Sequence, residues 1–382
     1  MRARIEKRTK PFLHFLVSSS KKIHGWYDWG RRECTSERFL LNPYCGCGLG
    51  CFYCYTRAFP GYFKEFHQKG YIFVFKDFDQ KVASQLDSLN IGFCGYLSPV
   101  SEPFQKIDKF YNISFKIAKV FIERNLPLEF ITKEKIPSSM IKLLRTQEHS
   151  FGQVSILTLN PKLSKILSNS YVEVLLENIK RLSENRIFSV CRVDPIIPYI
   201  NDNKAQLRRL LEEVKKRGAN HLVTSVLDIP FKIKDFVFRN IKKISGETLF
   251  KKISSLYKEK IGYLHADINY RKDIFSFLRR EADRLGLTFS LCMEYELKGS
   301  QILGLNREFS SSLNCEGRNV PLYKRKGKKF YPVEGCLGNC LTCKEPVCGI
   351  EELAYGKTRK PLALKYSDYR RFSQRIDSQG LG

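Results

Sequence analysis

The chain has 382 residues, of which 43% are hydrophobic, so it is long enough to bury a large core and is not a disordered protein. Lys and Arg number 66 against 39 Asp and Glu, and the resulting net charge of +27 favours polyanionic partners such as nucleic acid. The sequence has no run of about 18 apolar residues, which excludes a helix that crosses a membrane.

The first part of the chain, residues 1–36, is basic and aromatic. Residues 1–33 contain nine Lys or Arg and three acidic residues, and Phe, His, Trp and Tyr lie among them. This composition suits stacking on unpaired bases, although the aromatic residues would equally serve to cap the following domain. The apolar piece Phe12–Val17 is too short for a signal peptide core, so we expect a cytoplasmic protein. Thiols stay reduced there, and the 13 cysteines therefore indicate metal or redox chemistry.

Four cysteines fall within the stretch "NPYCGCGLGCFYC", residues 42–54. Cys47, Cys51 and Cys54 have the spacing C-x3-C-x2-C, and Cys45 precedes them. Three thiolates on one tight loop can hold three irons of a [4Fe–4S] cluster and leave the fourth iron open to a small molecule. A structural zinc site is the alternative, and it would need Cys45 as its fourth ligand.

From about residue 70, short apolar runs alternate with amphipathic stretches. The pattern predicts strands in residues 70–77, 90–98, 126–133, 152–159, 187–197, 220–227 and 287–295. It predicts helices in residues 111–124, 136–147, 170–185, 204–218 and 273–286. Strands that alternate with helices indicate an α/β fold with a parallel sheet, closed or partly closed as a barrel. We therefore expect a barrel domain over residues 37–300, with its site at the C-terminal ends of the strands.

The alternation stops after about residue 300, and residues 301–382 form a basic, Cys-rich region. Residues 318–382 contain fourteen Lys or Arg and six acidic residues. A second cysteine group has the spacing C-x3-C-x2-C-x4-C and consists of Cys336, Cys340, Cys343 and Cys348. Four thiolates can hold an auxiliary Fe–S cluster or a zinc ion, and Cys292 and Cys315 are alternative ligands. We expect this region to be ordered by its metal rather than by a core.

The first cysteine group and several later segments resemble one known family. "CGLGCFYC", with Tyr53 just before the third cysteine, resembles the signature of the radical S-adenosylmethionine superfamily. The order and spacing of "GYLSPVSEPFQKID", "EFITKEK", "VSILTLN" and "RVDPIIPYIND" resemble the spore photoproduct lyase-like branch, also called DNA repair photolyase-like proteins. The resemblance covers residues 38–300.

The resemblance implies a fold and a set of site residues. It implies a partial (β/α)6 barrel whose cluster loop follows the first strand, with Cys47, Cys51 and Cys54 as ligands of a [4Fe–4S] cluster. S-adenosylmethionine would lie near the segment 98–102, and aromatic residues flank the third cysteine. The residues implied to contact the cofactor or the reaction are Ser98, Ser101, Glu102, Lys133, Ser155, Arg192, Asp194, Tyr53 and Tyr55.

The resemblance also implies a reaction. A reductant such as ferredoxin or flavodoxin supplies an electron, S-adenosylmethionine is cleaved, and a 5′-deoxyadenosyl radical abstracts a hydrogen atom from the substrate. Together with the charge, this predicts an enzyme that repairs DNA or modifies RNA. A protein or small-metabolite substrate is one alternative, and a nucleic-acid-binding Fe–S protein without turnover is another.

One position departs from the lyase pattern. The lyase returns a hydrogen atom from a cysteine after its second strand, whereas this chain has Pro99 or Val100 there. Cys94, four residues before Ser98 on the same strand, is the candidate donor because alternate strand residues share a face. Cys191 is a second strand cysteine of the same kind, and a small buried hydrophobic residue is the alternative role for both.

Overall fold

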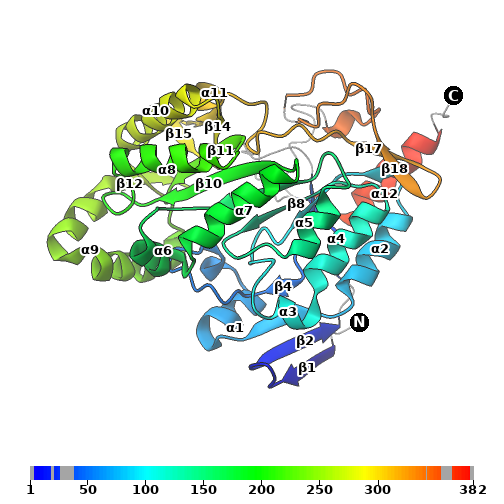
Figure 1. Cartoon of the computed structure of the whole chain (residues 1–382), viewed down its shortest axis with the longest axis horizontal. Coiled ribbons are helices and arrows are strands. Elements are labelled where there is room, and N and C mark those ends of the chain that lie inside the picture. The colour runs from blue at the N-terminus through cyan, green and yellow to red at the C-terminus, as the bar shows by residue number, and fades with distance from the viewer. Residues whose placement is uncertain (1–3, 19–20, 26–37, 341, 354–363, 379–382) are drawn as a thin grey trace.

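The structure is a computed structural model that describes residues 4–18, 21–25, 38–340, 342–353 and 364–378. Its centre is a sheet of seven parallel strands (Figure 1). Its strands, from one edge to the other, are β3 (Arg38–Leu41), β7 (Cys94–Leu97), β8 (Leu128–Thr132), β9 (Phe151–Ser155), β10 (Phe188–Ile196), β11 (His221–Val226) and β14 (Thr288–Leu291). The predicted α/β architecture is confirmed, and the strand predicted in residues 287–295 is present as β14, a seventh strand beside the six of the expected partial barrel.

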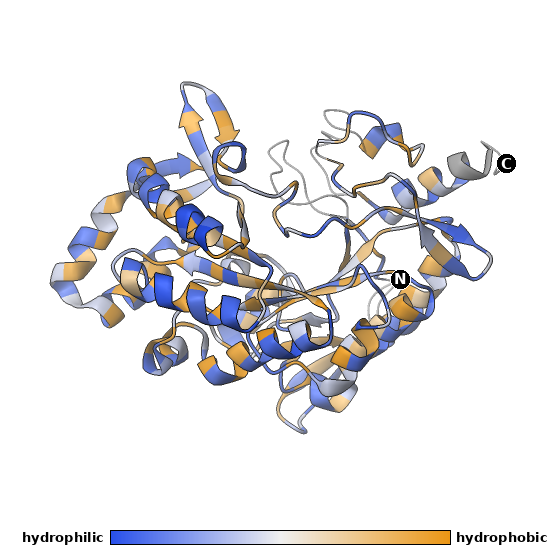
Figure 2. Ribbon diagram, turned by 45° about the horizontal axis from the view of Figure 1, so that its top comes forward, coloured by the Kyte–Doolittle hydropathy of each residue, from blue (hydrophilic) through white to orange (hydrophobic). Residues whose placement is uncertain are grey.

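Helices cover the outer side of this sheet and connect successive strands. All five predicted helices are present, as α4 (Ile113–Glu123), α5 (Ser138–Leu144), α7 (Val172–Glu184), α8 (Lys204–Lys216) and α10 (Ile268–Arg284). Figure 2 shows hydrophilic and hydrophobic residues alternating along them, and in α8 the four apolar residues of the predicted stripe are buried. Because each helix returns the chain to the same edge, the C-terminal ends of the parallel strands meet at the opposite edge.

A second, smaller sheet lies beside the barrel. Its order is β1 (Arg4–Arg8), β2 (His14–Ser18), β5 (Ile72–Phe75) and β4 (Tyr44–Cys45). The strand predicted in residues 70–77 is thus present, but it joins this sheet and not the barrel. Residues 26–37 of the basic aromatic segment lie outside the described residues. The smaller sheet matters for the site because β4 leads directly into the first cysteine group.

An insertion that the sequence did not predict follows β11. It contains the 3-10 helix η2 (Phe231–Ile233), the long helix α9 (Lys234–Leu256) and the antiparallel hairpin β12 (Tyr257–Ile261) and β13 (Tyr263–Ala266). Ile229 and Leu264 exchange backbone hydrogen bonds of 2.9 Å, which fix the hairpin against the loop after β11. The hairpin therefore forms a wall at the C-terminal edge of the sheet.

The C-terminal region packs against the barrel more closely than expected. The hairpin β17 (Tyr323–Lys326) and β18 (Lys329–Pro332) pairs with β6 (Ile91–Gly92), and the last helix is α12 (Tyr366–Ser378). The Tyr323 and Tyr369 side chains are fully buried in the main core, and the Tyr369 ring packs edge-on against Phe39 of β3. The expectation that metal alone orders this region is therefore wrong for these two elements, because both bury aromatic residues in the barrel core.

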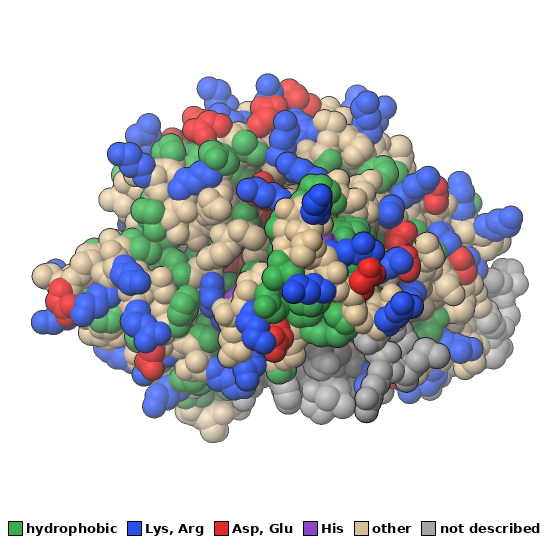
Figure 3. All heavy atoms as spheres, turned by 90° about the horizontal axis from the view of Figure 1, so that it is seen from below, with side chains coloured by type: hydrophobic (Ala, Val, Ile, Leu, Met, Phe, Trp, Pro, Cys, Tyr) green, Lys and Arg blue, Asp and Glu red, His purple; other side chains and the backbone are tan. Residues whose placement is uncertain are grey.

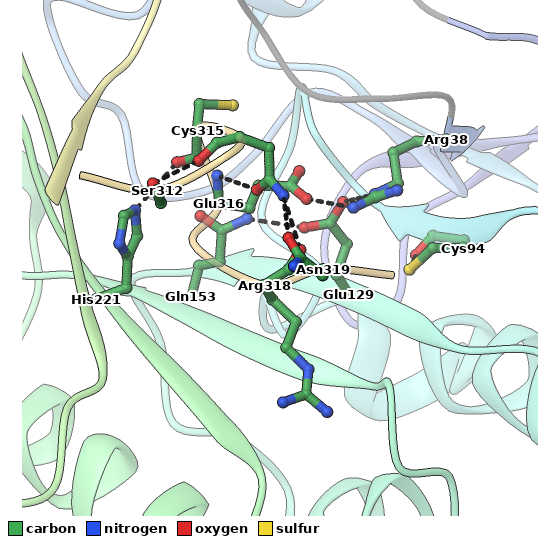
Figure 4. A network of polar contacts seen from close by, with 12 residues as sticks. Arg38, Cys94, Glu129, Gln153, His221, Ser312, Cys315, Glu316, Arg318 and Asn319 are labelled. Atoms are coloured by element: carbon green, nitrogen blue, oxygen red, sulfur yellow. Dashed lines mark hydrogen bonds and ion pairs between the residues drawn. The ribbon is translucent and has the colours of Figure 1, made fainter. Parts of the chain in front are cut away.

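A loop of the same region, residues 310–320, lies across the N-terminal ends of the strands (Figure 4). Arg38 of β3 donates hydrogen bonds to Glu316 (2.6 Å) and to Glu129 of β8 (2.9 Å), and all three side chains are buried. Gln153 of β9 donates to the second oxygen of Glu129 at 2.8 Å. This network fixes the loop at the N-terminal end of the barrel, opposite the edge at which the strands end.

Candidate active site

The first cysteine group forms a loop directly after β3 and β4. Gly46 begins it at φ +93°, and a Cβ atom there would lie 2.5 Å from the Phe66 ring, so only glycine fits. The backbone N–H of Cys54 donates to the Cys51 carbonyl at 3.3 Å, and the N–H of Arg57 donates to the Cys54 carbonyl at 3.1 Å. These turns bring the three C-x3-C-x2-C thiols to one side of the loop.

Cys47, Cys51 and Cys54 line a pocket at the C-terminal edge of the sheet. The opposite wall is the segment 98–102 after β7, and the end of β8 contributes Thr132 and Lys133. The space between these walls is about 710 Å³ including the open mouth of the pocket, so the pocket is accessible from solvent. The structure therefore brings together the cysteines and four of the residues that the resemblance implied for the cofactor, namely Ser98, Ser101, Glu102 and Lys133, and adds Thr132.

The thiols of this loop are suited to a metal cluster. Burial, and then the neighbouring Cys51 thiol, raise the pKa of Cys47, and burial likewise raises that of Cys51, where the Lys133 charge opposes the rise. Without a metal these thiols hold their protons, and coordination to iron would favour the thiolates. Among the residues that the structure describes, no group of His, Cys, Asp and Glu is arranged to hold a single metal ion.

The pocket wall contains polar groups that have no partner among the residues that the structure describes. The hydroxyls of Ser98 and Ser101 are buried and make no hydrogen bond, and Ser98 adopts φ +55°, a conformation that few non-glycine residues take. Buried polar groups normally have partners, because leaving one unpaired costs about 1–3 kcal/mol. These hydroxyls thus indicate a polar ligand in the pocket.

Glu102 is held rigidly beside them. Its carboxylate accepts hydrogen bonds from Thr132 Oγ1 (2.6 Å), from the Lys133 backbone N–H (2.8 Å) and from the Phe104 backbone N–H (3.1 Å). Burial raises the pKa of Glu102 to about 7, and these hydrogen bonds oppose the rise. A fixed carboxylate of this kind suits an amino group of a ligand. Thr132, which sequence reasoning missed, stands next to Lys133 in "EFITKEK", and its strand-end position was the available signal.

Two tyrosines flank the third cysteine. The buried Tyr53 hydroxyl has no hydrogen-bond partner of good geometry, although burial and the adjacent Cys51 thiol raise its pKa. The Tyr55 hydroxyl donates to the Pro99 carbonyl at 3.0 Å and so links the cluster loop to the opposite wall. Tyr55 lines the pocket and Tyr53 does not.

Ser155, Arg192 and Asp194 lie deeper in the barrel. Ser155 ends β9 and pairs in register with Arg192 of β10. The Arg192 guanidinium donates to Gln153 (3.0 Å) and to Asp194, whose other oxygen accepts from Ser225 at 2.5 Å. These three residues are neighbours at the predicted strand ends, but they do not line the pocket around the cysteines.

The remaining cysteines of the barrel lie away from the pocket. Cys94, the candidate hydrogen donor, begins β7, and Figure 4 shows it next to Arg38 at the N-terminal end of the barrel. Burial raises the pKa of Cys94 well above its usual range. Cys191 is buried in the core, and Cys45 lies in β4 against Val17 and Phe73. The geometry thus favours a packing role for Cys94, Cys191 and Cys45.

The second cysteine group is partly gathered. Burial is the main cause that raises the pKa of Cys348, and the Cys336 and Cys343 thiols raise it further. These three thiols are therefore electrostatic neighbours. Cys336 Sγ accepts a hydrogen bond from the Leu322 N–H at 3.3 Å. The alternative ligands Cys292 and Cys315 are electrostatic neighbours of each other instead. A four-thiolate site for an auxiliary Fe–S cluster or zinc at Cys336, Cys340, Cys343 and Cys348 stays a prediction.

Comparison with known proteins gives two informative similarities. No protein-family model matches the sequence. The radical SAM Nα-GlyT isomerase of Pseudomonas phage M6 is 26% identical over 385 residues, which cover 94% of this chain and 78% of the isomerase. A spore photoproduct lyase double mutant, solved with AdoMet and dinucleoside spore photoproduct, is similar in fold, with a TM-score of 0.50 and 14% identity over 68% of this chain and 78% of the lyase. The chain is therefore similar over most of its length to a radical S-adenosylmethionine enzyme, and similar in fold to a lyase that binds AdoMet.

Proposed function

We propose that Cys47, Cys51 and Cys54 hold a [4Fe–4S] cluster and that Ser98, Ser101 and Glu102 bind S-adenosylmethionine. The unpartnered hydroxyls of the two serines and the fixed Glu102 carboxylate, all within one pocket with the three thiols, carry this assignment. When bound, the cluster and S-adenosylmethionine supply a 5′-deoxyadenosyl radical that abstracts hydrogen. In this arrangement the Glu102 carboxylate would accept hydrogen bonds from the amino group of the cofactor, and the serine hydroxyls would bind its other polar atoms. Tyr55 links the two walls of the pocket through its hydrogen bond to Pro99.

The substrate that we propose is nucleic acid. The net charge of +27 supports a polyanionic partner, and Lys and Arg outnumber Asp and Glu on the face shown in Figure 3. The lyase of similar fold was solved with a dinucleoside in its site, which supports a nucleoside unit as the reacting group.

The reaction class that we propose is isomerisation. The phage relative is an isomerase and is aligned with 94% of this chain. An isomerisation takes one hydrogen atom from the substrate and returns one to it, so the substrate is neither oxidised nor reduced. It needs no thiol that donates hydrogen, which agrees with the place of Cys94 at the far end of the barrel.

The test uses the protein with its cluster reconstituted under anaerobic conditions. It is mixed with a reductant, S-adenosylmethionine and, separately, bulk transfer RNA, double-stranded DNA, ultraviolet-damaged DNA and a protein mixture. We expect one nucleic acid to stimulate 5′-deoxyadenosine formation, and we expect binding to weaken steeply with salt because phosphate contacts release counterions. No binding at low salt, or stimulation by the protein mixture alone, would contradict a nucleic-acid substrate.

A further inference from the structure

Three carboxylates meet inside the barrel, beyond the pocket around the cysteines. They follow the C-terminal ends of three neighbouring strands: Asp194 in β10, Asp228 after β11 and Glu294 after β14. They are close enough that Glu294 and Asp194 act electrostatically on Asp228. Carboxylates brought together in this way repel one another unless each has a counter-charge.

Two of the three have their counter-charges within the protein. Asp194 is paired with Arg192 and accepts from Ser225. Glu294 accepts from the Arg271 guanidinium at 2.8 Å and from the Val226 backbone N–H at 2.7 Å. Asp228 is different: among the described residues its carboxylate has no ion-pair partner, and it accepts a hydrogen bond only from its own backbone N–H, with the Arg271 charge as a weaker neighbour. It is also partly exposed, and is thus open to a ligand.

A buried hydroxyl without a partner lies beside Asp228. Tyr257, the first residue of the hairpin, is 7% exposed, and its hydroxyl makes no hydrogen bond with any part of the chain that the structure describes. The hairpin carries Tyr257 toward Asp228, because Leu264 is hydrogen-bonded to Ile229, the residue after Asp228, and Tyr257 pairs with Ala266 on the same strand as Leu264. After burial, the Asp228 and Glu294 carboxylates raise the pKa of the Tyr257 hydroxyl, so both act on it electrostatically. An unpaired hydroxyl near a carboxylate that lacks an ion-pair partner is costly in the free protein, and a ligand that donates hydrogen bonds and carries positive charge satisfies both.

These groups lie across the barrel from the cluster loop. Tyr55, which lines the pocket, is an electrostatic neighbour of Cys54 on one side and of Cys292, Tyr263 and Asp194 on the other. Arg57 of the same loop lies over the Phe236 ring at 4.4 Å, so the insertion after β11 contacts the cluster loop directly. A substrate between the pocket and the hairpin would thus touch both.

We infer that Asp228, with the Tyr257 hydroxyl beside it, binds a protonated amino group of the substrate. The inference rests on the proposed function, since it names a feature of the same substrate. A divalent cation is a poorer fit, because Ca²⁺ and Mg²⁺ need about six or more oxygen ligands and the oxygens of Asp194 and Glu294 already have partners. A phosphate is also a poor fit, because the surplus charge here is negative.

The test compares two small ligands that differ only in this charge. The reconstituted protein with S-adenosylmethionine is titrated with 5-aminomethyl-2′-deoxyuridine and with 5-hydroxymethyl-2′-deoxyuridine. We expect wild-type protein to prefer the amine by about tenfold, which is the effect of one charge-assisted hydrogen bond. Asp228→Asn should reduce the ratio to about one. Tyr257→Phe, which removes only an unpartnered hydroxyl and so should fold normally, should lower the ratio about threefold.

The matched control is Asp235→Asn, the same chemical change at an exposed position in the first turn of α9. It should leave the ratio unchanged. The inference is overturned if wild-type protein shows no preference for the amine, including the case in which it binds neither nucleoside, or if Asp228→Asn keeps the preference. It is also overturned if Asp228→Asn abolishes binding of S-adenosylmethionine, since the carboxylate then belongs to the cofactor site.

The proposed function is tested separately by salt-dependent binding of an unmodified oligonucleotide, which contains no amine of this kind. If the oligonucleotide does not bind, the proposal of a nucleic-acid substrate is wrong. The ratio of the two nucleoside affinities still tests whether Asp228 binds an amino group. The two results are thus distinguishable.

Discussion

At the scale of single residues, the four cysteines of the first loop differ in what surrounds them. Cys45 packs with Val17 and Phe73 in a small apolar cluster, and burial raises its pKa to about 12 against the effect of Lys21. The other three line the pocket. The surplus cysteine is thus a packing residue of β4, and the open iron of a cluster bound by the others would stay free for the cofactor.

This division predicts opposite results for two alanine variants. Cys47→Ala removes a cluster ligand, so we expect loss of iron and of S-adenosylmethionine cleavage. Cys45→Ala removes a buried thiol from an apolar cluster, so we expect a stability loss of about 1 kcal/mol and full cleavage. Iron content and 5′-deoxyadenosine formation are measured after anaerobic reconstitution. If the Cys45 variant binds its cluster but does not cleave S-adenosylmethionine, the assignment of Cys45 as a packing residue is wrong.

The two unpartnered serines allow a ligand role to be separated from a structural role. In Ser98→Ala or Ser101→Ala no hydrogen bond is lost in the free protein, so the free energy of unfolding should stay within about 0.5 kcal/mol of the wild-type value. Affinity for S-adenosylmethionine should fall about five- to tenfold, as expected for one hydrogen bond.

Ser114→Ala is the matched control for these serine variants. The Ser114 hydroxyl donates to the Pro103 carbonyl at 2.6 Å, in a buried setting outside the pocket. Its loss should lower stability by about 1–3 kcal/mol and leave cofactor affinity unchanged. Chemical denaturation and isothermal titration measure the two quantities. Serine variants of the pocket that unfold more easily and bind S-adenosylmethionine normally would contradict the ligand role.

The sequence indicates some of these residues and hides others. Ser98 and Glu102 adjoin a predicted strand end in a segment that resembles a known family, so local sequence was enough. Asp228 and Tyr257 gave no signal, because 29 positions separate them in the chain and they meet only through the fold of the hairpin. Local patterns cannot show which of several acidic residues lacks a partner, since that depends on contacts such as Arg271 with Glu294.

At the scale of elements, periodicity predicted the barrel and missed the insertion. The five outer helices have continuous apolar stripes, and the strands are apolar because both faces are covered. In α9, Gly246 takes φ +76° and breaks the helix into two parts, and only Val237, Ile241 and Ile253 are buried. Without a continuous stripe the segment gives no clear helical pattern. The strand β12, "YKEKI", is short and largely polar, and it is placed by pairing rather than by composition.

His221, the first residue of β11, should make the stability of the barrel depend on pH. The His221 ring contacts Thr288 Oγ1 (2.8 Å) and Ser290 Oγ (2.9 Å) of β14, and burial lowers its pKa from 6.5 to about 3. Between these values the unfolded chain binds a proton that the folded chain does not. His221 therefore contributes stability that is complete above pH 6.5 and is lost as the pH falls toward 3.

We expect the cluster-free protein to lose about 2 kcal/mol of unfolding free energy through this residue between about pH 7 and pH 5. Urea denaturation at both pH values measures the loss. His221→Gln is less stable at neutral pH because its contacts change, but its stability should depend less on pH over this interval. Equal pH dependence in the variant and in wild-type protein would show that His221 is not the residue responsible.

At the scale of the whole molecule, the C-terminal region completes the barrel from two sides. Loop 310–320 supplies Glu316 to the buried Arg38 at the N-terminal end of the strands (Figure 4), and α12 covers β3 with Tyr369. Composition suggested a separate appendage because the region is basic and rich in Gly, Pro and Cys. Its buried aromatic residues are widely spaced in the sequence, so a local reading could not detect them as part of the core.

The region should therefore be required for folding of the barrel. In a chain that ends at residue 300, Arg38 loses its ion pair with Glu316, and Phe39 and Phe93 lose their contacts with Tyr369. Removing one partner of a buried ion pair alone costs about 3–5 kcal/mol, a large part of the stability of a domain.

We expect this truncated chain to show no cooperative unfolding and no cluster uptake, whereas a chain that ends at residue 378 and keeps α12 should show both. Circular dichroism during urea denaturation and iron analysis give the readout. Cooperative unfolding of the shorter chain would show instead that residues 301–382 are a dispensable addition to a complete barrel.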